Sequence, residues 1–132
     1  MGLSILVVED DFTSRRVMRH IMEAYGDCDV AIDGAEAVDA VRIGLESGRR
    51  YDLICLDIMM PNMDGQAALK AIRALEEEHG YRPGRGARIL ITSALDDSKN
   101  VLEAFNAQCD GYIVKPYDKH KVAAELEAQG LI

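Results

Sequence analysis

Short apolar runs alternate along the chain with longer segments of helical periodicity. Five runs are rich in branched residues and end at turn-forming or charged residues, which predicts strands; they are 4–8, 28–32, a run that ends at Asp57, 89–91 and 111–114. Apolar residues at helical spacing predict five helices; these are 12–25, 34–45, 66–78, a helix around 101–105, and 118–129. Such alternation is typical of a parallel sheet with helices on both faces and right-handed crossovers. The pattern predicts an α/β, doubly wound three-layer domain.

Three segments carry more detailed expectations. Cys28, Val30 and Ile32 alternate with polar or small residues, which predicts an edge strand with one buried face. Thr13 or Ser14 is a candidate N-cap for the first helix. The fourth helix is expected to start near the polar residues 96–98, and its buried face to be formed by three residues, which are Val101, Leu102 and Phe105.

The segment 80–88 contains three Gly, one Pro and three Arg, and it predicts a long, exposed basic loop. A solvated connection is the simpler interpretation, and contact with a partner is the alternative.

Composition limits the function classes. With 132 residues, the chain fits one domain spanning 1–132. A net charge of −8 argues against direct nucleic-acid binding and favours protein partners. No apolar run approaches the length of a membrane span, and the chain enters its first strand without a basic leader, so we expect a cytoplasmic protein. The three cysteines form no CxxC pair and predict core residues in a reducing compartment.

Polar residues stand where the predicted strands end. These are Glu9 and Asp10, Asp57, Ser93 and Lys115. The flavodoxin-like class has the strand order 2-1-3-4-5, and ligands bind where that order reverses, between the first and third strands. This order would bring Glu9, Asp10 and Asp57 into one crevice.

Three carboxylates in one crevice repel, by roughly 4 kcal/mol per pair at ~4 Å with an effective dielectric of about 20. A hard divalent ion such as Mg²⁺, the ammonium of Lys115, or a proton on one acid could offset this repulsion. An exposed crevice favours the metal. The combination suits phosphoryl transfer to a nucleophilic Asp57, with Ser93 as a hydrogen-bonding group for a phosphoryl oxygen.

The polar strand ends lie in four longer motifs. These are Val7-Val8-Glu9-Asp10-Asp11, the stretch 56–65 (Leu-Asp-Ile-Met-Met-Pro-Asn-Met-Asp-Gly), Thr92-Ser93-Ala94, and Gly111-Tyr112-Ile113-Val114-Lys115-Pro116. In order and spacing they resemble the receiver domains of two-component response regulators, in particular the single-domain, CheY-like proteins. The resemblance spans the chain and implies a CheY-like (βα)5 fold.

The resemblance also implies roles for single residues. Asp57 would accept a phosphoryl group from the phosphohistidine of a sensor histidine kinase or phosphotransfer protein. Asp10, Asp57 and the main-chain carbonyl of Met59 would ligate Mg²⁺, with Glu9 acting through water. Ser93 and Tyr112 would form the switch pair. Lys115 would contact the phosphoryl group, and its peptide bond to Pro116 would be cis.

Several positions depart from the family pattern. Glu9 stands where many relatives have Asp, and Ser93 replaces the commoner Thr. Met59 and Leu95 are apolar where relatives with rapid turnover carry polar groups that position water. The resemblance therefore predicts a long-lived phosphoryl state.

Two surfaces are implied to bind partners. The first helix contributes to kinase docking in the family, which gives a possible role to the basic stripe of Arg15, Arg16 and Arg19. Output usually passes through the fourth helix, fifth strand and fifth helix. These elements would place three residues near a downstream protein target, which are Tyr112, Lys119 and Lys121.

The sequence also allows three alternative interpretations. A phosphatase with a strand-ending Asp would resemble Asp-x-Asp, but Met59 occupies the second acidic position, so a switch that is not a turnover enzyme is favoured. An FMN-binding flavodoxin would need a phosphate loop after the first strand, where this chain has Glu9-Asp10-Asp11. The chain could also be the excised receiver of a larger regulator, although Leu131-Ile132 resembles a natural end and favours a stand-alone protein.

Overall fold

The computed structural model of the chain describes residues 2–60, 63–82, 84–94 and 98–132. Within these residues, five strands alternate with five helices, as the hydrophobic pattern predicts. The elements are β1 (Leu3–Val8), α1 (Phe12–Met22), β2 (Gly26–Ala31), α2 (Gly34–Glu46), β3 (Leu53–Asp57), α3 (Gly65–Glu78), β4 (Arg88–Ser93), α4 (Ser98–Asn106), β5 (Gly111–Val114) and α5 (Lys119–Ala128).

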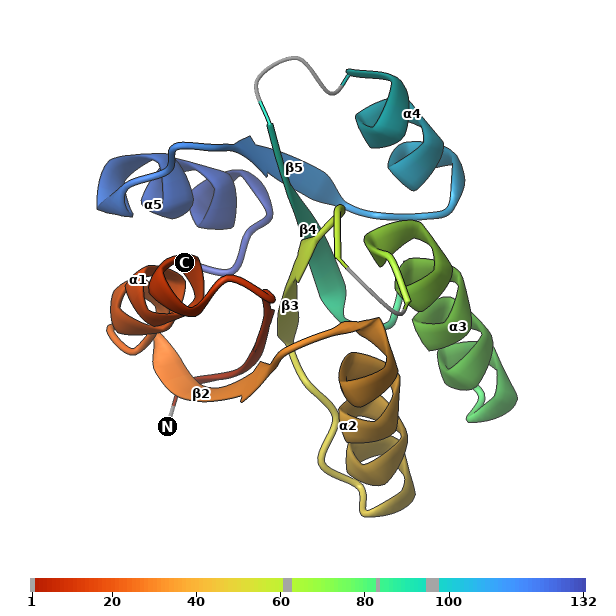
Figure 1. Ribbon diagram of the computed structural model, residues 1–132. Helices are drawn as coiled ribbons and strands as arrows, with labels where there is room; N and C mark the ends of the chain where they lie inside the picture. The colour runs from red at the N-terminus through yellow and green to blue at the C-terminus, as the bar shows by residue number, and fades with distance from the viewer. Residues whose placement is uncertain (1, 61–62, 83, 95–97) are drawn as a thin grey trace.

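The strands form one parallel sheet in the order β2-β1-β3-β4-β5, which confirms the predicted flavodoxin-like order. Helices α1 and α5 lie on one face, and α2, α3 and α4 lie on the other (Figure 1). The strand order reverses between β1 and β3, so their carboxyl ends flank the point where this class of fold binds ligands.

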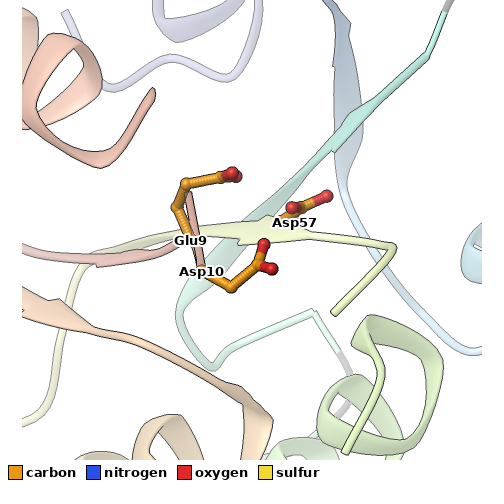
Figure 2. A group of neighbouring side chains, drawn as sticks. All are labelled: Glu9, Asp10 and Asp57. Atoms are coloured by element: carbon orange, nitrogen blue, oxygen red, sulfur yellow. The ribbon is translucent and has the colours of Figure 1, made fainter. Parts of the chain in front are cut away.

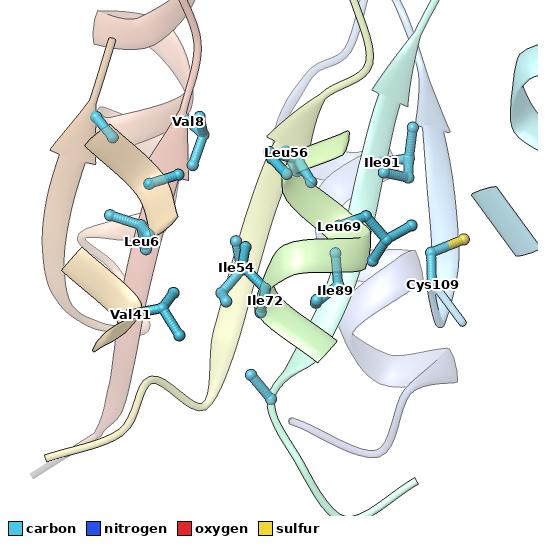
Figure 3. Close-up of a cluster of buried hydrophobic side chains, with 14 of the residues drawn as sticks. Leu6, Val8, Val41, Ile54, Leu56, Leu69, Ile72, Ile89, Ile91 and Cys109 are labelled. Atoms are coloured by element: carbon cyan, nitrogen blue, oxygen red, sulfur yellow. The ribbon is translucent and has the colours of Figure 1, made fainter. Parts of the chain in front are cut away.

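The core fills both spaces between the sheet and its helices. Alternate residues of β1 point to opposite faces: Leu6 and Val8 join the cluster under α2 and α3 (Figure 3), and Ile5 and Val7 join the cluster under α1 and α5. Every residue of the central strand β3 is buried. The buried central strand therefore holds the backbone of Asp57, the last residue of β3, in a fixed position.

Helix α1 differs from prediction at both ends. The N-cap is Asp11, and neither Thr13 nor Ser14 fills that role: the Asp11 carboxylate accepts a hydrogen bond from the Ser14 main-chain N–H at 2.8 Å. The helix ends at Met22 and does not reach Tyr25. An Asp carboxylate satisfies the exposed N–H groups of the first turn as well as a hydroxyl does, so sequence alone left the cap ambiguous.

Strand β2 lies at the edge of the sheet, as predicted, but its burial pattern was predicted wrongly. Val30 and Ile32 remain 37% and 48% exposed, whereas Ala31 is buried. Cys28 is half-buried. An edge strand has a neighbour on one side only, so its larger side chains are not covered as they would be inside the sheet.

The buried face of α4 was also predicted wrongly. Ala104 is the buried residue of this helix, whereas Leu102 and Phe105 are 64% and 41% exposed. The Phe105 ring meets Tyr112 on β5 edge to face, with centroids 6.0 Å apart. The small side chain of Ala104 faces the core, which turns the larger apolar residues to the surface. The proposed start at residues 96–97 lies outside the described residues.

A partly buried ion cluster, with Glu76 buried and Arg73 and Asp110 half-buried, joins α3 to the α3–β4 and α4–β5 connections. The Arg73 guanidinium pairs with Glu76 at 2.7 Å and with Asp110 at 2.8 Å, and it donates to the carbonyl of Ala87 at 2.8 Å. Glu76 also accepts the Ala87 N–H at 2.7 Å. These contacts fix both ends of the segment between α3 and β4.

In the part of the chain that the structure describes, no helix is long and apolar enough to cross a bilayer.

Candidate functional site

The strand register brings the polar strand ends together at one edge of the sheet. Val8 pairs with Leu56, so Glu9 and Asp10 follow β1 directly beside Asp57. Ser93 ends β4, and its carbonyl accepts the Lys115 N–H at 2.7 Å. The predicted site residues therefore converge from four strands.

Glu9, Asp10 and Asp57 form an acidic cluster (Figure 2). A carboxylate oxygen from each lies within 4.8 Å of one from each of the others. Glu9 and Asp57 are each only 3% exposed, whereas Asp10 is exposed. The cluster thus combines two buried acids with one that opens to solvent.

Lys115 is the cation at this cluster. Its Nζ lies 3.3 Å from Oε2 of Glu9 and 3.4 Å from Oδ2 of Asp57. Burial lowers the pKa of Lys115, but the carboxylates of Asp57 and Glu9 together outweigh burial and raise it, so the ammonium stays charged. The peptide bond from Lys115 to Pro116 is cis, as the family resemblance implied.

One lysine does not neutralise this cluster. Burial, followed by the hydrogen bond and charge of Asp57, raises the pKa of Glu9 to about 7, although Lys115 acts in the opposite direction. Near neutral pH, Glu9 is therefore protonated in only part of the molecules when no other cation is present. The three acids can carry more negative charge than Lys115 neutralises, so an additional cation would be bound favourably at this cluster.

A hard divalent cation such as Mg²⁺ fits the residues present, because all three side chains offer oxygen ligands and Asp10 is open to solvent. Met59 joins the cluster through its main-chain N–H, which donates to Oδ1 of Asp57 at 3.2 Å. The role of its carbonyl as a metal ligand stays a prediction. The Met59 side chain is 66% exposed.

The predicted switch pair, Ser93 and Tyr112, differs in solvent exposure. The Ser93 side chain is 1% exposed, and its Oγ has no hydrogen-bond partner among the described residues. A buried hydroxyl without a partner is costly and calls for an explanation. Tyr112 is 44% exposed and packs against Phe105. Leu95, also named from sequence, lies outside the described residues.

Arg15 has a role that the sequence did not reveal. Its Nη1 donates to the carbonyl of Glu9 at 2.9 Å and to that of Asp10 at 3.3 Å. The sequence showed only a basic stripe on α1, because a contact five or six residues back depends on the turn between β1 and α1. Arg15 therefore supports the connection that carries two of the three acids.

The comparisons with known proteins agree with this geometry. Residues 5–127 match the sequence model of the response regulator receiver domain. The chain belongs to this family. Receiver domains are phosphorylation-activated switches of two-component systems and act in signalling.

Curated relatives contain this receiver domain within longer chains. The transcriptional regulatory protein ResD of Bacillus subtilis is 36% identical over 125 residues, which cover 94% of this chain and 46% of ResD. The osmosensing histidine protein kinase SLN1 of Saccharomyces cerevisiae is 30% identical over 127 residues, 95% of this chain and 10% of SLN1. The chain thus spans half or less of the length of these relatives.

Solved structures support the fold. The chemotaxis protein CheY4 of Vibrio cholerae superposes with a TM-score of 0.80 at 23% identity, covering 100% of both chains. The receiver domain of the sensor histidine kinase PA1611 of Pseudomonas aeruginosa, solved with a magnesium ion in its active-site cleft, has a TM-score of 0.79 at 26% identity and 97% coverage of both chains. Both likenesses confirm a CheY-like architecture.

Proposed function

We propose that Asp57 of this receiver domain accepts a phosphoryl group from the phosphohistidine of a sensor histidine kinase or phosphotransfer protein. The observation that carries the proposal is the acidic cluster with Lys115 3.4 Å from Asp57. Glu9, Asp10, Asp57 and the Met59 carbonyl would hold Mg²⁺. The magnesium bound by the PA1611 receiver supports this assignment.

The transfer needs positioning and charge neutralisation more than proton movement. A carboxylate oxygen of Asp57 forms the new bond to phosphorus, the bond from phosphorus to the histidine nitrogen breaks, and the electron pair stays on the imidazole. The Met59 main-chain N–H, which donates to Oδ1 of Asp57, orients the carboxylate, and Lys115 stabilises charge on the phosphoryl oxygens. Bound Mg²⁺ would supply further positive charge to those oxygens.

The buried hydroxyl of Ser93 provides the link to a conformational change. Because Oγ has no partner among the described residues, a phosphoryl oxygen on Asp57 would give it one. Movement of Ser93 toward that oxygen would open space into which the exposed Tyr112 ring turns. Phosphorylation need only shift an existing two-state equilibrium.

Two surfaces suit the partners of such a switch. Leu102, Phe105 and Tyr112 form an exposed apolar area on α4 and β5, beside α5 with Lys119 and Lys121. We assign the downstream protein target to this area. The sensor kinase would dock near α1, where Arg16 and Arg19 are exposed.

Turnover as a phosphatase is a weaker alternative. An Asp-x-Asp phosphatase uses a second acid for the leaving group, and Met59 holds that position here. The receiver would assist its own phosphorylation and dephosphorylation without acting on a separate substrate.

The test is incubation with acetyl phosphate and Mg²⁺, followed by intact mass spectrometry. We expect the mass of one added phosphoryl group in the unaltered chain and none in Asp57→Ala. Asp39→Ala, which removes an exposed carboxylate on α2, is the matched control and should be labelled normally. No adduct on the unaltered chain, or an adduct that survives in Asp57→Ala, would overturn the proposal.

A further inference from the structure

Two connections meet at the edge of the sheet opposite Asp57. They are residues 47–52, which lead into β3, and the described residues 79–82 and 84–87, which lead into β4. The Arg88 N–H donates to the carbonyl of Asp52 at 2.9 Å, and Nη1 of Arg50 donates to the carbonyl of Arg85 at 3.2 Å. The two connections therefore form one continuous surface.

This surface is rich in arginine in an otherwise acidic chain. Segments 48–51 and 80–88 contain no acidic residue, while the net charge of the chain is −8. We call three residues the arginine patch: Arg50, Arg85 and Arg88. None of them forms an ion pair within the described part of the chain, although other arginines do so on α1, α2 and α3.

The patch surrounds a shallow hollow. Arg50, Arg85 and Arg88 line a volume of 320 Å³ together with the backbone of Gly84 and Gly86. Asp52 also lines it, but its carboxylate already accepts the Ser4 N–H at 2.8 Å. The hollow is thus lined by three arginines and by one carboxylate that already accepts a hydrogen bond.

The backbone beneath the arginines is fixed. Glu76 accepts the Ala87 N–H, and its carbonyl accepts the Tyr81 N–H at 2.9 Å. A Cβ on Gly86 would clash with the Glu76 carboxylate, which Arg73 and the Ala87 N–H hold in place. The Arg50 guanidinium stacks over the Tyr81 ring at 5.0 Å. A preformed surface loses less conformational entropy when a ligand binds.

We propose that the arginine patch binds an acidic peptide segment of a partner protein, with side-chain carboxylates seated in the hollow. The planar guanidinium fork matches a carboxylate through two parallel hydrogen bonds, and the patch uses arginine throughout. A nucleic acid or an anionic membrane would extend beyond the hollow and meet the acidic remainder of the chain. A short acidic segment would contact the arginines without reaching the acidic remainder of the chain.

This surface is independent of the proposed phosphoryl transfer, because it lies at the other ends of β3 and β4. Binding there would attach the receiver to a partner while leaving Asp57 and the α4 and β5 surface accessible.

The probe is a fluorescein-labelled octaglutamate peptide, and its binding is followed by fluorescence anisotropy at low salt. We expect saturable binding that weakens about tenfold in Arg85→Ser/Arg88→Ser, which removes two of the arginines that line the hollow. The matched control, Arg42→Ser/Lys99→Ser, removes the same charge from exposed positions elsewhere and should change affinity less than about twofold. Labelling by acetyl phosphate should be unchanged in both variants, which separates this proposal from that for Asp57.

Three results would overturn the proposal: no binding of octaglutamate, equal weakening in both double variants, or tighter binding of single-stranded DNA or phosphatidylserine vesicles than of the peptide. Equal weakening would show non-specific charge attraction. Tighter binding of DNA or vesicles would assign the patch to another class of partner.

Discussion

Nη1 of Arg15 donates a hydrogen bond to the main-chain carbonyl of Glu9 at 2.9 Å, and the same guanidinium lies over the Phe12 ring at 5.5 Å. With its second contact to the carbonyl of Asp10, Arg15 ties the start of α1 to the connection that carries both acids. The position of two proposed Mg²⁺ ligands therefore depends on a residue that touches neither carboxylate.

Arg15→Ala should weaken Mg²⁺ binding about tenfold, because groups that orient metal ligands typically contribute at least that much. Isothermal titration calorimetry with Mg²⁺ measures this directly. Arg16→Ala is the matched control, since Arg16 also stacks on Phe12 at 5.6 Å but makes no described contact with the Glu9 or Asp10 carbonyl. Arg15→Lys should give an intermediate affinity. Equal affinities for Arg15→Ala and the unaltered chain would remove this positioning role.

The buried Glu9 carboxyl should make the metal-free protein less stable as pH rises. Its pKa is raised from 4.5 to about 7 in the folded state, so between these values the folded chain holds a proton that the unfolded chain has released. The stabilisation is fully present below pH 4.5 and is lost as pH rises through 7, a total loss of on the order of 3 kcal/mol.

Urea unfolding in EDTA between pH 5 and 8 tests this expectation. Glu9→Gln should abolish most of the decline, and Mg²⁺ should offset it in the unaltered chain at pH 8. Glu103→Gln, on the exposed side of α4, should leave the pH profile as it is. A decline of equal size in Glu9→Gln would assign it to other groups.

Ser93→Ala should separate stability from switching. The Ser93 hydroxyl is buried without a partner among the described residues, so its removal should leave the unphosphorylated protein as stable as before or raise its free energy of unfolding by about 1 kcal/mol. The same variant should lose the change at Tyr112 on phosphorylation, because no hydroxyl remains to bind the phosphoryl oxygen. Fluorotyrosine NMR with acetyl phosphate follows this change, and Ser93→Thr should retain it. A Tyr112 response that persists in Ser93→Ala would contradict the coupling.

The Arg73 cluster, in which Glu76 is buried, should contribute more to stability than the exposed ion pairs do. Removal of Arg73 leaves Glu76 buried without its cation, so Arg73→Ala should cost about 3–5 kcal/mol. Arg42→Ala removes a surface pair with Asp39 at the same helical spacing and should cost less than about 1 kcal/mol. Chemical denaturation of both variants gives the comparison, and similar losses would show that burial of the Arg73 cluster adds nothing.

The sequence predicted the fold and the cluster for a common physical reason. Buried parallel strands must be apolar, so a polar residue such as Asp57 marks the end of its strand, and parallel order places all such ends at one edge. The hydrophobic pattern alone therefore assigns four further residues to that edge: Glu9, Asp10, Ser93 and Lys115.

Other features depend on contacts that periodicity does not encode. Leu102 and Phe105 have the spacing of a buried face, yet the packing of Ala104 determines which side of α4 meets the core. The contacts of Arg73 with Asp110, and of Arg50 with Arg85, join residues at least 35 positions apart. Such contacts depend on how the sheet places the connections in space, and the local sequence pattern does not encode this placement.

Met59 should prolong the phosphoryl state of Asp57. Its side chain is 66% exposed two residues after Asp57, and it offers no group that could hydrogen-bond a water attacking phosphorus. Met59→Asn would supply such a group, and one net hydrogen bond of about 1 kcal/mol corresponds to roughly fivefold faster loss of the phosphoryl group. Intact mass spectrometry over time, after removal of acetyl phosphate, measures both lifetimes. Ile43→Asn, at a position 65% exposed on α2, should decay like the unaltered chain. Rapid loss from the unaltered chain, or equal lifetimes for Met59→Asn and Ile43→Asn, would show that Met59 does not control hydrolysis.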